Sequence, residues 1–155
     1  GWNTLDSHRH AHDDTLAGFG FGRRFGEHWS VDFEFESYNT HYDDDYLVRI
    51  GQAGWNGEFR VKQYHFAGRY RFRPDARLQP YLVGTVGLER TRASNGSGED
   101  PVWSAGFGIS YRINSWLDAR TQVVRRYSYN ERVSLDVSHL EDTSYRLDLV
   151  FRLPW

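Results

Sequence analysis

Apolar and polar side chains alternate along one stretch near the start of the chain, WSVDFEFES at residues 29–37. In an extended chain, successive side chains point to opposite sides, so the aromatic and aliphatic residues share one face while the serine and acidic residues share the other. A strand with one face in a dry core and the other in water fits this pattern. A strand whose apolar face meets lipid fits it equally well, so the rest of the chain has to decide.

The same period of two recurs along the chain and predicts about seven strands. They are expected at residues 16–25, 28–38, 59–73, 78–91, 102–113, 116–129 and 144–155. Stretches of about 10 to 15 residues suit a tilted strand that crosses a membrane, whereas strands in globular proteins average about 5 or 6. No segment gives a convincing helix.

The connections between the predicted strands alternate between tight turns and long polar stretches. RFGEHW, RPDAR and INSW predict tight turns, because they contain glycine, proline, aspartate and asparagine. The long polar stretches are residues 39–58, 92–101 and 130–142. A transmembrane β-barrel sorts its connections in this way, with short turns on the periplasmic side and long loops outside. A soluble sandwich has no reason to do so.

The number of strands leads to an expectation about the first strand. Bacterial single-chain barrels have an even number of strands, whereas the pattern gives about seven. Residues 10–14 (HAHDD) occupy a long-loop position, so a strand should precede them, and only residues 1–7 (GWNTLDS) are available for it. We expect either a stub there or a first strand that mostly precedes Gly1. The predicted fold is all-β: one domain over residues 1–155, an eight-stranded antiparallel up-and-down transmembrane β-barrel whose first strand is short or truncated.

One face of the predicted strands is almost free of charge. The residues expected to face lipid include Trp29, Phe33, Phe35, Phe66, Phe72, Phe107, Leu149 and Phe151. An arginine or lysine facing lipid at mid-depth costs about 2 to 4 kcal/mol, so an uncharged face is what a membrane requires. Several tryptophan and tyrosine residues fall near strand ends, where amphipathic rings favour the membrane interface.

The opposite face carries acidic and basic side chains in similar numbers. The predicted lumenal ion network consists of Asp32, Glu34, Glu36, Arg69, Arg71, Glu89, Asp118, Arg120, Arg146 and Asp148. We expect these charges to neutralise one another, because a buried charge without a partner is costly. A barrel of about eight strands holds side chains and little else, so a wide pore is excluded. Ion pairs that exchange partners leave a gated small-ion channel as an alternative function.

Composition narrows the class of protein further. The chain has 155 residues, 39% of them hydrophobic and 26% charged, and no run approaches the roughly 18 apolar residues of a spanning helix. It has no cysteine, so disulfides and thiolate metal sites are excluded. The net charge of -2 gives no nucleic-acid footprint. A soluble, lipocalin-like ligand-binding barrel would show the same alternation with the aromatic face inside, but it does not explain the sorted connections.

Two polar clusters have metal-ligand chemistry. They are the weak candidate site His8, His10 and His12, and the acidic run Asp43, Asp44 and Asp45. Alternating histidines can bind a divalent transition ion, and adjacent carboxylates can attract calcium. Solvated loops are the favoured interpretation of both, so neither a metal nor another cofactor is expected.

A lipid-modifying enzyme would need a nucleophile within hydrogen-bond reach of a base. Ser138 and His139 lie close to Glu141 in sequence, but adjacent residues of a strand point apart and no motif supports a triad. The prediction is a protein without enzymatic activity.

Three segments carry a family resemblance. LAGFGFGRRFGEHWSVDFEFE, RFRPDARLQPYLVGTVGLERT and WSAGFGISYRINSWLDARTQVVRRYSYN resemble the eight-stranded barrel domain of the OmpA-like outer-membrane proteins, and LQPYLVGTVG is the most specific part. The final strand, SYRLDLVFRLPW, resembles the C-terminal signal by which such barrels are recognised for assembly. The short first strand departs from the family pattern.

The resemblance implies a bacterial outer-membrane location and a structural role in envelope anchoring and integrity, with surface loops for partner contact. The implied partners are outer-membrane lipid and lipopolysaccharide, and the barrel-assembly machinery through the last strand. Peptidoglycan would be a partner through a possible periplasmic domain after residue 155.

Overall fold

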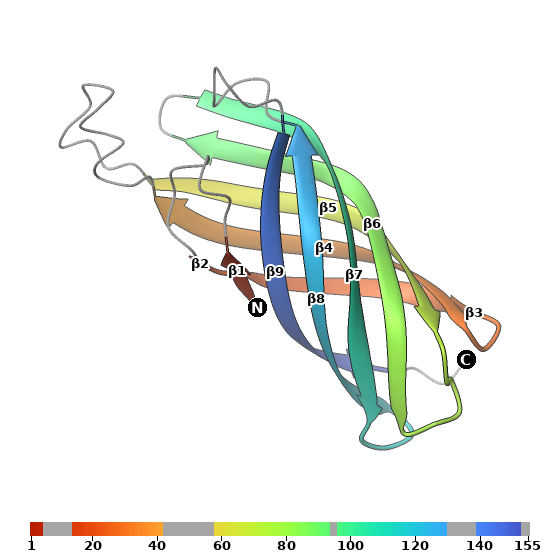
Figure 1. The fold of residues 1–155 in the computed structure, drawn as a ribbon. Helices are drawn as coiled ribbons and strands as arrows, with labels where there is room; N and C mark the ends of the chain where they lie inside the picture. Colours follow the sequence, from red (N-terminus) through yellow and green to blue (C-terminus); the bar gives the residue numbers. More distant parts are fainter. Residues whose placement is uncertain (5–13, 42–57, 94–95, 130–138, 153–155) are drawn as a thin grey trace.

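The computed structural model describes residues 1–4, 14–41, 58–93, 96–129 and 139–152 (Figure 1). Seven long strands form most of this part of the chain: β3 (Ala17–Phe25), β4 (Trp29–His41), β5 (Glu58–Arg71), β6 (Leu78–Ala93), β7 (Gly96–Arg112), β8 (Leu117–Tyr129) and β9 (His139–Phe151). Two short strands, β1 (Trp2–Thr4) and β2 (Asp14–Thr15), precede them. In these ranges no helix is long and apolar enough to cross a membrane.

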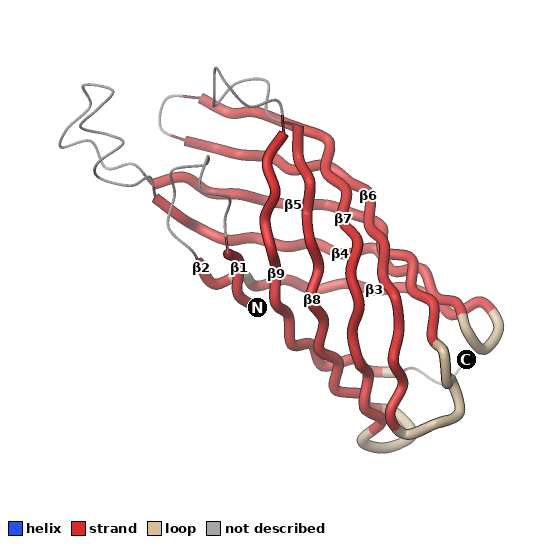
Figure 2. The backbone as a smooth tube through the Cα atoms, in the orientation of Figure 1, coloured by secondary structure: helices blue, strands red, loops and turns tan. Residues whose placement is uncertain are grey.

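The strands form one antiparallel sheet in the order β2-β1-β9-β8-β7-β6-β5-β4-β3. Each long strand pairs with the strand that follows it in sequence, and the sheet is curled (Figures 1 and 2). β1 pairs with β9 on one side and with β2, which directly precedes β3, on the other. The predicted all-β class and the antiparallel up-and-down order are therefore confirmed.

The N-terminal residues lie between the first and last long strands. Trp2 is opposite Tyr145 of β9 on one side and Thr15 of β2 on the other. Gly1 extends this pairing, because its carbonyl oxygen accepts a 3.0 Å hydrogen bond from the amide of Leu16. β1 does not reach further along the two strands. In the described part of the chain, β3 therefore pairs only with β4, and residues 147–151 of β9 pair only with β8. The sheet is open along this part.

Several predicted loop boundaries are wrong. Residues 39–41 and Glu58 were expected in a long loop, but they belong to β4 and β5 and pair with each other's strands. Residues 96–101 were expected in a long loop, but they belong to β7 and pair with residues 88–93 of β6. Glycine, serine and acidic residues resemble a loop in composition, yet β6 supplies a continuous set of backbone partners for them. Similarly, β9 begins at His139, inside the segment that was expected to be a loop up to residue 142.

The tight turns gather at one end of the sheet, as Figure 1 shows. Gly26 has a φ of 65°, in the left-handed region that glycine enters without steric cost. In the β7–β8 turn, the side-chain oxygen of Asn114 accepts 2.9 Å hydrogen bonds from the amides of Trp116 and Leu117. Asparagine is favoured in turns because its side chain caps backbone amides in this way.

Candidate functional site: an ionic interior within an apolar belt

The two sides of the curled sheet differ in chemistry. The buried polar residues lie on its inner side, and they include Arg69 at 2% exposure and Asp118 at 1%. The outer side is lined by large apolar side chains, such as Phe107 at 64% exposure and Leu149 at 63%. This is the inverse of a water-soluble barrel, whose apolar residues fill the inside.

Two guanidinium groups hold the acidic residues of β4 at the centre of the interior. Arg69 of β5 donates hydrogen bonds to both Asp32 and Glu34. Arg120 of β8 approaches from another part of the wall, with terminal nitrogens 3.5 Å from Asp32 Oδ2 and 3.6 Å from Glu34 Oε1. Its Nε also donates a 2.9 Å hydrogen bond to Asp148 Oδ2 on β9. Four strands are thus joined by one set of charges.

The network continues along β4 towards the end of the sheet opposite the tight turns. Arg146 of β9 donates to Glu34 Oε2 at 3.1 Å and also pairs with Glu36. His65 Nε2 lies 3.1 Å from Glu34 Oε2 and 3.5 Å from Glu36 Oε1. Arg126 Nη2 lies 3.7 Å from Glu36 Oε2. Besides Arg69 and Arg120, the buried carboxylates of Glu34 and Glu36 therefore face three further cationic or hydrogen-bonding side chains, which offset the cost of burying them.

A second cluster lies closer to the tight turns. Asp118 accepts a 2.8 Å hydrogen bond from Arg152 Nε and a further contact from the same guanidinium. Arg24 Nη2 lies 3.4 Å from Asp118 Oδ2. This aspartate therefore links β8 to β3 and to the residue that follows β9.

The structure places all ten residues of the predicted ion network on the inner side of the sheet. Seven of them form the central network: Asp32, Glu34, Glu36, Arg69, Arg120, Arg146 and Asp148. Asp118 belongs to the second cluster. Glu89 accepts a 2.6 Å hydrogen bond from Gln63, and Arg71 is buried near the tight turns.

The prediction left out several inner residues that take part. Gln63 contacts Glu89, and the hydroxyl of Tyr81 donates a 2.9 Å hydrogen bond to Gln122. Period two carries the signal for these residues, because all of them share the parity of the charged positions on their strands. These uncharged residues were missed because their side chains do not demand a partner in the way that charges do. The predicted network also left out three charged residues that take part, Arg24, Arg126 and Arg152.

The glycines of β3 make room for the acidic side chains of β4. A Cβ added at Gly22 would lie 2.0 Å from Asp32 Oδ1, and one added at Gly18 would lie 3.0 Å from the Cγ of Glu36. Both distances are too short for ordinary contacts. The alternate glycines of AGFGFG therefore let the β4 carboxylates lean across the neighbouring strand.

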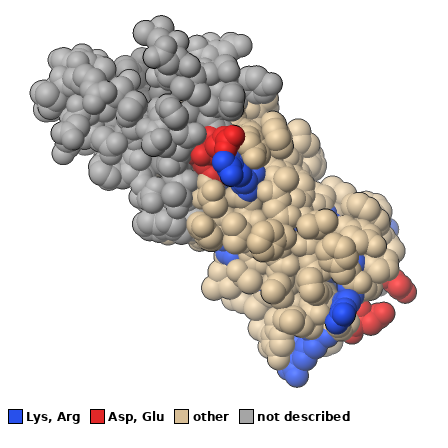
Figure 3. Space-filling model, viewed as in Figure 1, with Lys and Arg blue, Asp and Glu red and all other residues tan. Residues whose placement is uncertain are grey.

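The apolar belt contains the residues that were expected to face lipid. Trp29, Phe66, Phe72, Phe107, Leu149 and Phe151 are all more than half exposed. Phe33 and Phe35 are less exposed because neighbouring rings cover them: Phe33 lies 5.4 Å from Phe66, and Phe35 lies 5.1 Å from Tyr64, between ring centroids. On the visible face in Figure 3, one cluster of charged side chains lies beside the grey residues and others lie at the lower end, with a largely uncharged surface between them.

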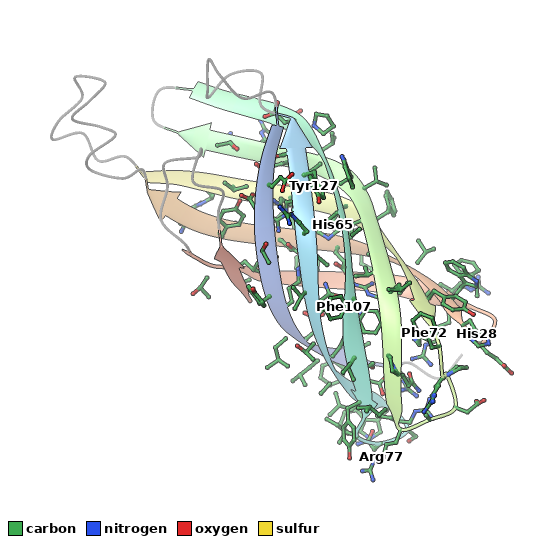
Figure 4. The ribbon with its side chains drawn as sticks, in the orientation of Figure 1. His28, His65, Phe72, Arg77, Phe107 and Tyr127 are labelled. Carbon is green, nitrogen blue, oxygen red and sulfur yellow. The ribbon has the colours of Figure 1, made fainter. Side chains whose placement is uncertain are left out.

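Aromatic and polar side chains mark the tight-turn end of the belt, where Figure 4 labels His28, Phe72 and Arg77. His28 stacks on Tyr70 at 5.4 Å, and Trp29 meets the same ring edge-on at 4.9 Å. Arg77 lies over the ring of Tyr111 at 5.1 Å. Rings combined with polar groups are the usual composition of a membrane interface.

Most residues of the other candidate sites are not covered by the structure. His8, His10, His12, Asp43, Asp44, Asp45 and Ser138 lie outside the described residues. His139 begins β9, and Glu141 pairs with Arg125. Ligand atoms of Glu34, Glu36 and His65 lie within 4.8 Å of one another, a spacing that a metal ion could bridge. Arginines already pair with both carboxylates, so ion pairing is the chemistry that the geometry shows.

Comparisons with known proteins bear on the fold. No family model matches the chain, and no curated protein matches it. Among solved structures, the chain is similar to the crystal structure of Neisserial surface protein A, with a TM-score of 0.62 and 13% sequence identity. The match covers 96% of this chain and 92% of that one. At this identity, the likeness shows a shared fold over nearly the whole length of both chains.

Proposed function

We propose that this chain is a structural β-barrel of a bacterial outer membrane, of the OmpA-like type, which contributes to envelope anchoring and integrity. The observation that carries the proposal is the inverted distribution of side chains, apolar outside and ionic inside. Hydrocarbon is the solvent that favours such an exterior, and closed strand pairing is what lipid demands of the backbone. The similarity to a Neisserial surface protein supports the same type of fold.

The height of the belt fits a bilayer. Exposed apolar positions of β6 run from Leu78 to Leu88. With a rise of about 3.3 Å per residue and a tilt of about 40°, this segment spans about 25 Å along the membrane normal, the height of the apolar band in such barrels. The tight turns would then face the periplasm, and the opposite end would face outward.

The proposed barrel has eight strands, with β1 as part of the first. The open edges of β3 and of residues 147–151 lie on either side of the line along which β1 would continue past Gly1. A strand in this position would satisfy the backbone groups of both edges, which lipid cannot do.

The interior favours a structural role over a wide channel. Arginine and carboxylate side chains from β4, β5, β8 and β9 meet across it, as described above. An apolar ligand of the kind that lipocalins bind would have to displace these paired charges, which argues against that alternative. Absence of enzymatic activity, contact with the assembly machinery and contact with peptidoglycan stay predictions.

One observation keeps a small-ion channel as a second candidate. Arg120 is bonded to Asp148 but also lies within 3.6 Å of Asp32 and Glu34 on the opposite wall. A guanidinium with two sets of partners could exchange them and open a narrow path. Single-channel recording in a planar bilayer, with Arg120→Gln compared with the unmodified protein, tests this function directly.

Electrophoretic mobility in detergent tests the main proposal. A folded barrel resists the detergent until it is boiled, so the unboiled protein should migrate faster than the boiled protein. Extraction of the protein from cell envelopes should also require detergent. A protein that is fully soluble without detergent and migrates identically before and after boiling would rule the proposal out.

A further inference from the structure

A group of cations lies on the outer side of β5 and β6, just past the apolar belt. We call it the cationic patch, and it consists of Arg60, Lys62, Arg90 and Arg92. Lys62 is directly opposite Arg90 in the strand register, and Arg60 is directly opposite Arg92. All four share the parity of exposed belt residues on the same strands, such as Tyr64 and Leu88.

The patch has more positive charge than its described neighbours neutralise. Glu99 of β7 lies 3.4 Å from Arg90, and Arg60 donates a 2.8 Å hydrogen bond to the neutral side chain of Asn39. Lys62 and Arg92 form no ion pair with any side chain whose placement the structure describes. Like charges directly opposite each other destabilise a strand pair. An anion bound between these strands would remove that cost.

An outward-facing arginine on another strand, by contrast, does have an acidic partner. Arg125 of β8 lies on the same side of the sheet and towards the same end, and it pairs with Glu141 of the neighbouring β9. Among the side chains that the structure describes, an outward arginine on β8 thus has an acidic partner, whereas two of the four cations on β5 and β6 have none. This contrast leaves Lys62 and Arg92 available for an anion that is not among the described side chains.

The position of the patch indicates what kind of anion it meets. Lys62 and Arg90 are the next outward positions after Tyr64 and Leu88, which end the apolar belt. In the orientation proposed above, this level corresponds to the headgroups of the outer leaflet. A ligand with both acyl chains and phosphates could contact the belt and the patch together, whereas free phosphate could use the cations alone.

We propose that the cationic patch binds the phosphorylated headgroup of lipopolysaccharide, with its phosphates between β5 and β6 and its acyl chains against Tyr64 and Leu88. This inference rests on the proposed outer-membrane function and names a lipid partner and its site. Charge-assisted hydrogen bonds from arginine and lysine to phosphate oxygens supply the recognition. The phosphates also separate the opposed cations.

The test uses the full chain, folded in detergent, and lipid A carrying two phosphates as the probe. Binding is measured by native mass spectrometry for the unmodified protein and for the double variant Lys62→Gln/Arg92→Gln, which removes the two cations that lack an ion-pair partner. The affinity of the variant should fall about thirty-fold, because each cation beside an anionic lipid surface contributes about a factor of five. Lipid A with one phosphate should bind the unmodified protein more weakly than the probe does.

A matched control removes the same charge from the other end of the belt. Arg23 and Arg73 are exposed near the tight turns, and Arg23→Gln/Arg73→Gln should leave lipid A binding unchanged. Equal losses in the two double variants, unchanged affinity in Lys62→Gln/Arg92→Gln, or equal affinity for phosphatidylglycerol would each overturn the inference.

Heat-dependent mobility and flotation with phosphatidylcholine vesicles are measured on the same samples. They report membrane insertion without lipid A. If the cationic patch does not bind lipid A, the mobility shift and the flotation are still observed. If the protein is not an outer-membrane barrel, both are lost.

Discussion

Single residues of the interior act through the partners that they hold together. Arg69 is 2% exposed and bonds to carboxylates at two positions of β4. Its removal would leave those carboxylates with fewer positive neighbours in a place that water barely reaches. At this scale, stability depends on matching each buried charge, because an unmatched charge costs far more than a surface ion pair contributes.

Arg69→Met is expected to lower the free energy of unfolding by about 3 kcal/mol, the lower end of the range for removing one partner of a buried ion pair. The lower end applies because Arg120 and Arg146 remain beside the same acids. Urea unfolding in lipid vesicles measures the change. Arg23→Gln, on the exposed side of β3, is the control and should change stability by less than about 0.5 kcal/mol. Equal effects would contradict the role given to Arg69.

The glycine positions differ in the space that they leave for a larger side chain. A Cβ at Gly108 would lie 2.4 Å from both the backbone oxygen of Thr121 and the hydroxyl of Tyr81, whereas a Cβ at Gly84 would have its nearest neighbour at 4.0 Å. Gly108→Ala should therefore destabilise the sheet by about 1 to 3 kcal/mol through overpacking. Gly84→Ala should be nearly neutral in the same unfolding measurement. If both variants behave alike, the close contacts at Thr121 and Tyr81 are not the cause.

The sequence pattern predicts the strands better than it predicts which charged side chains pair with each other. Period two is visible in the sequence, and it was enough to predict the seven long strands and to sort charged from apolar positions. The pairing of individual charges was not predictable, because it depends on the stagger between strands. Arg146 and Glu34, for example, are 112 positions apart. The start of β7 was missed because Gly96–Arg112 begins with residues of low strand propensity, and only the partner strand stabilises them there.

The outer face of β6 and β7 should show a dependence on depth. Phe107 is in the middle of the belt and Leu88 is at its outer edge. Arginine at Phe107 should cost about 2 to 4 kcal/mol in a bilayer, whereas arginine at Leu88 should cost about 0 to 1 kcal/mol. Unfolding of Phe107→Arg and Leu88→Arg in vesicles tests this. Equal costs would mean that the belt does not lie across hydrocarbon.

For the molecule as a whole, the important contact is the one that β1 makes between the first and last long strands of the sheet. β1 connects β9 to the segment that leads into β3, so a few N-terminal residues bring the curl towards closure. Everything proposed about a closed interior depends on this contact. The chain has no cysteine, which makes the contact easy to probe.

A disulfide should form between Asn3→Cys and Ser144→Cys, which are directly opposite each other on β1 and β9. Opposed residues of antiparallel strands have Cα atoms about 4.5 to 5.5 Å apart, within the range that a disulfide spans. Non-reducing mass spectrometry after mild oxidation reports the bond. Asn3→Cys with Ser128→Cys, where Ser128 belongs to β8 and has other partners, is the control and should stay reduced. Absence of the first bond would place the N-terminus elsewhere.

The contact between Glu34 and Arg146 also bears on biogenesis. In a chain that stops before β9, Glu34 of β4 would lack Arg146, and Arg120 of β8 would lack Asp148. The inner surface of the other strands would therefore be incompletely neutralised. If the protein enters a bilayer as we propose, such a fragment would do so at an electrostatic cost. β9 thereby acts as an electrostatic check on assembly of the sheet, because the carboxylates of β4 reach their full set of partners only when β9 is present.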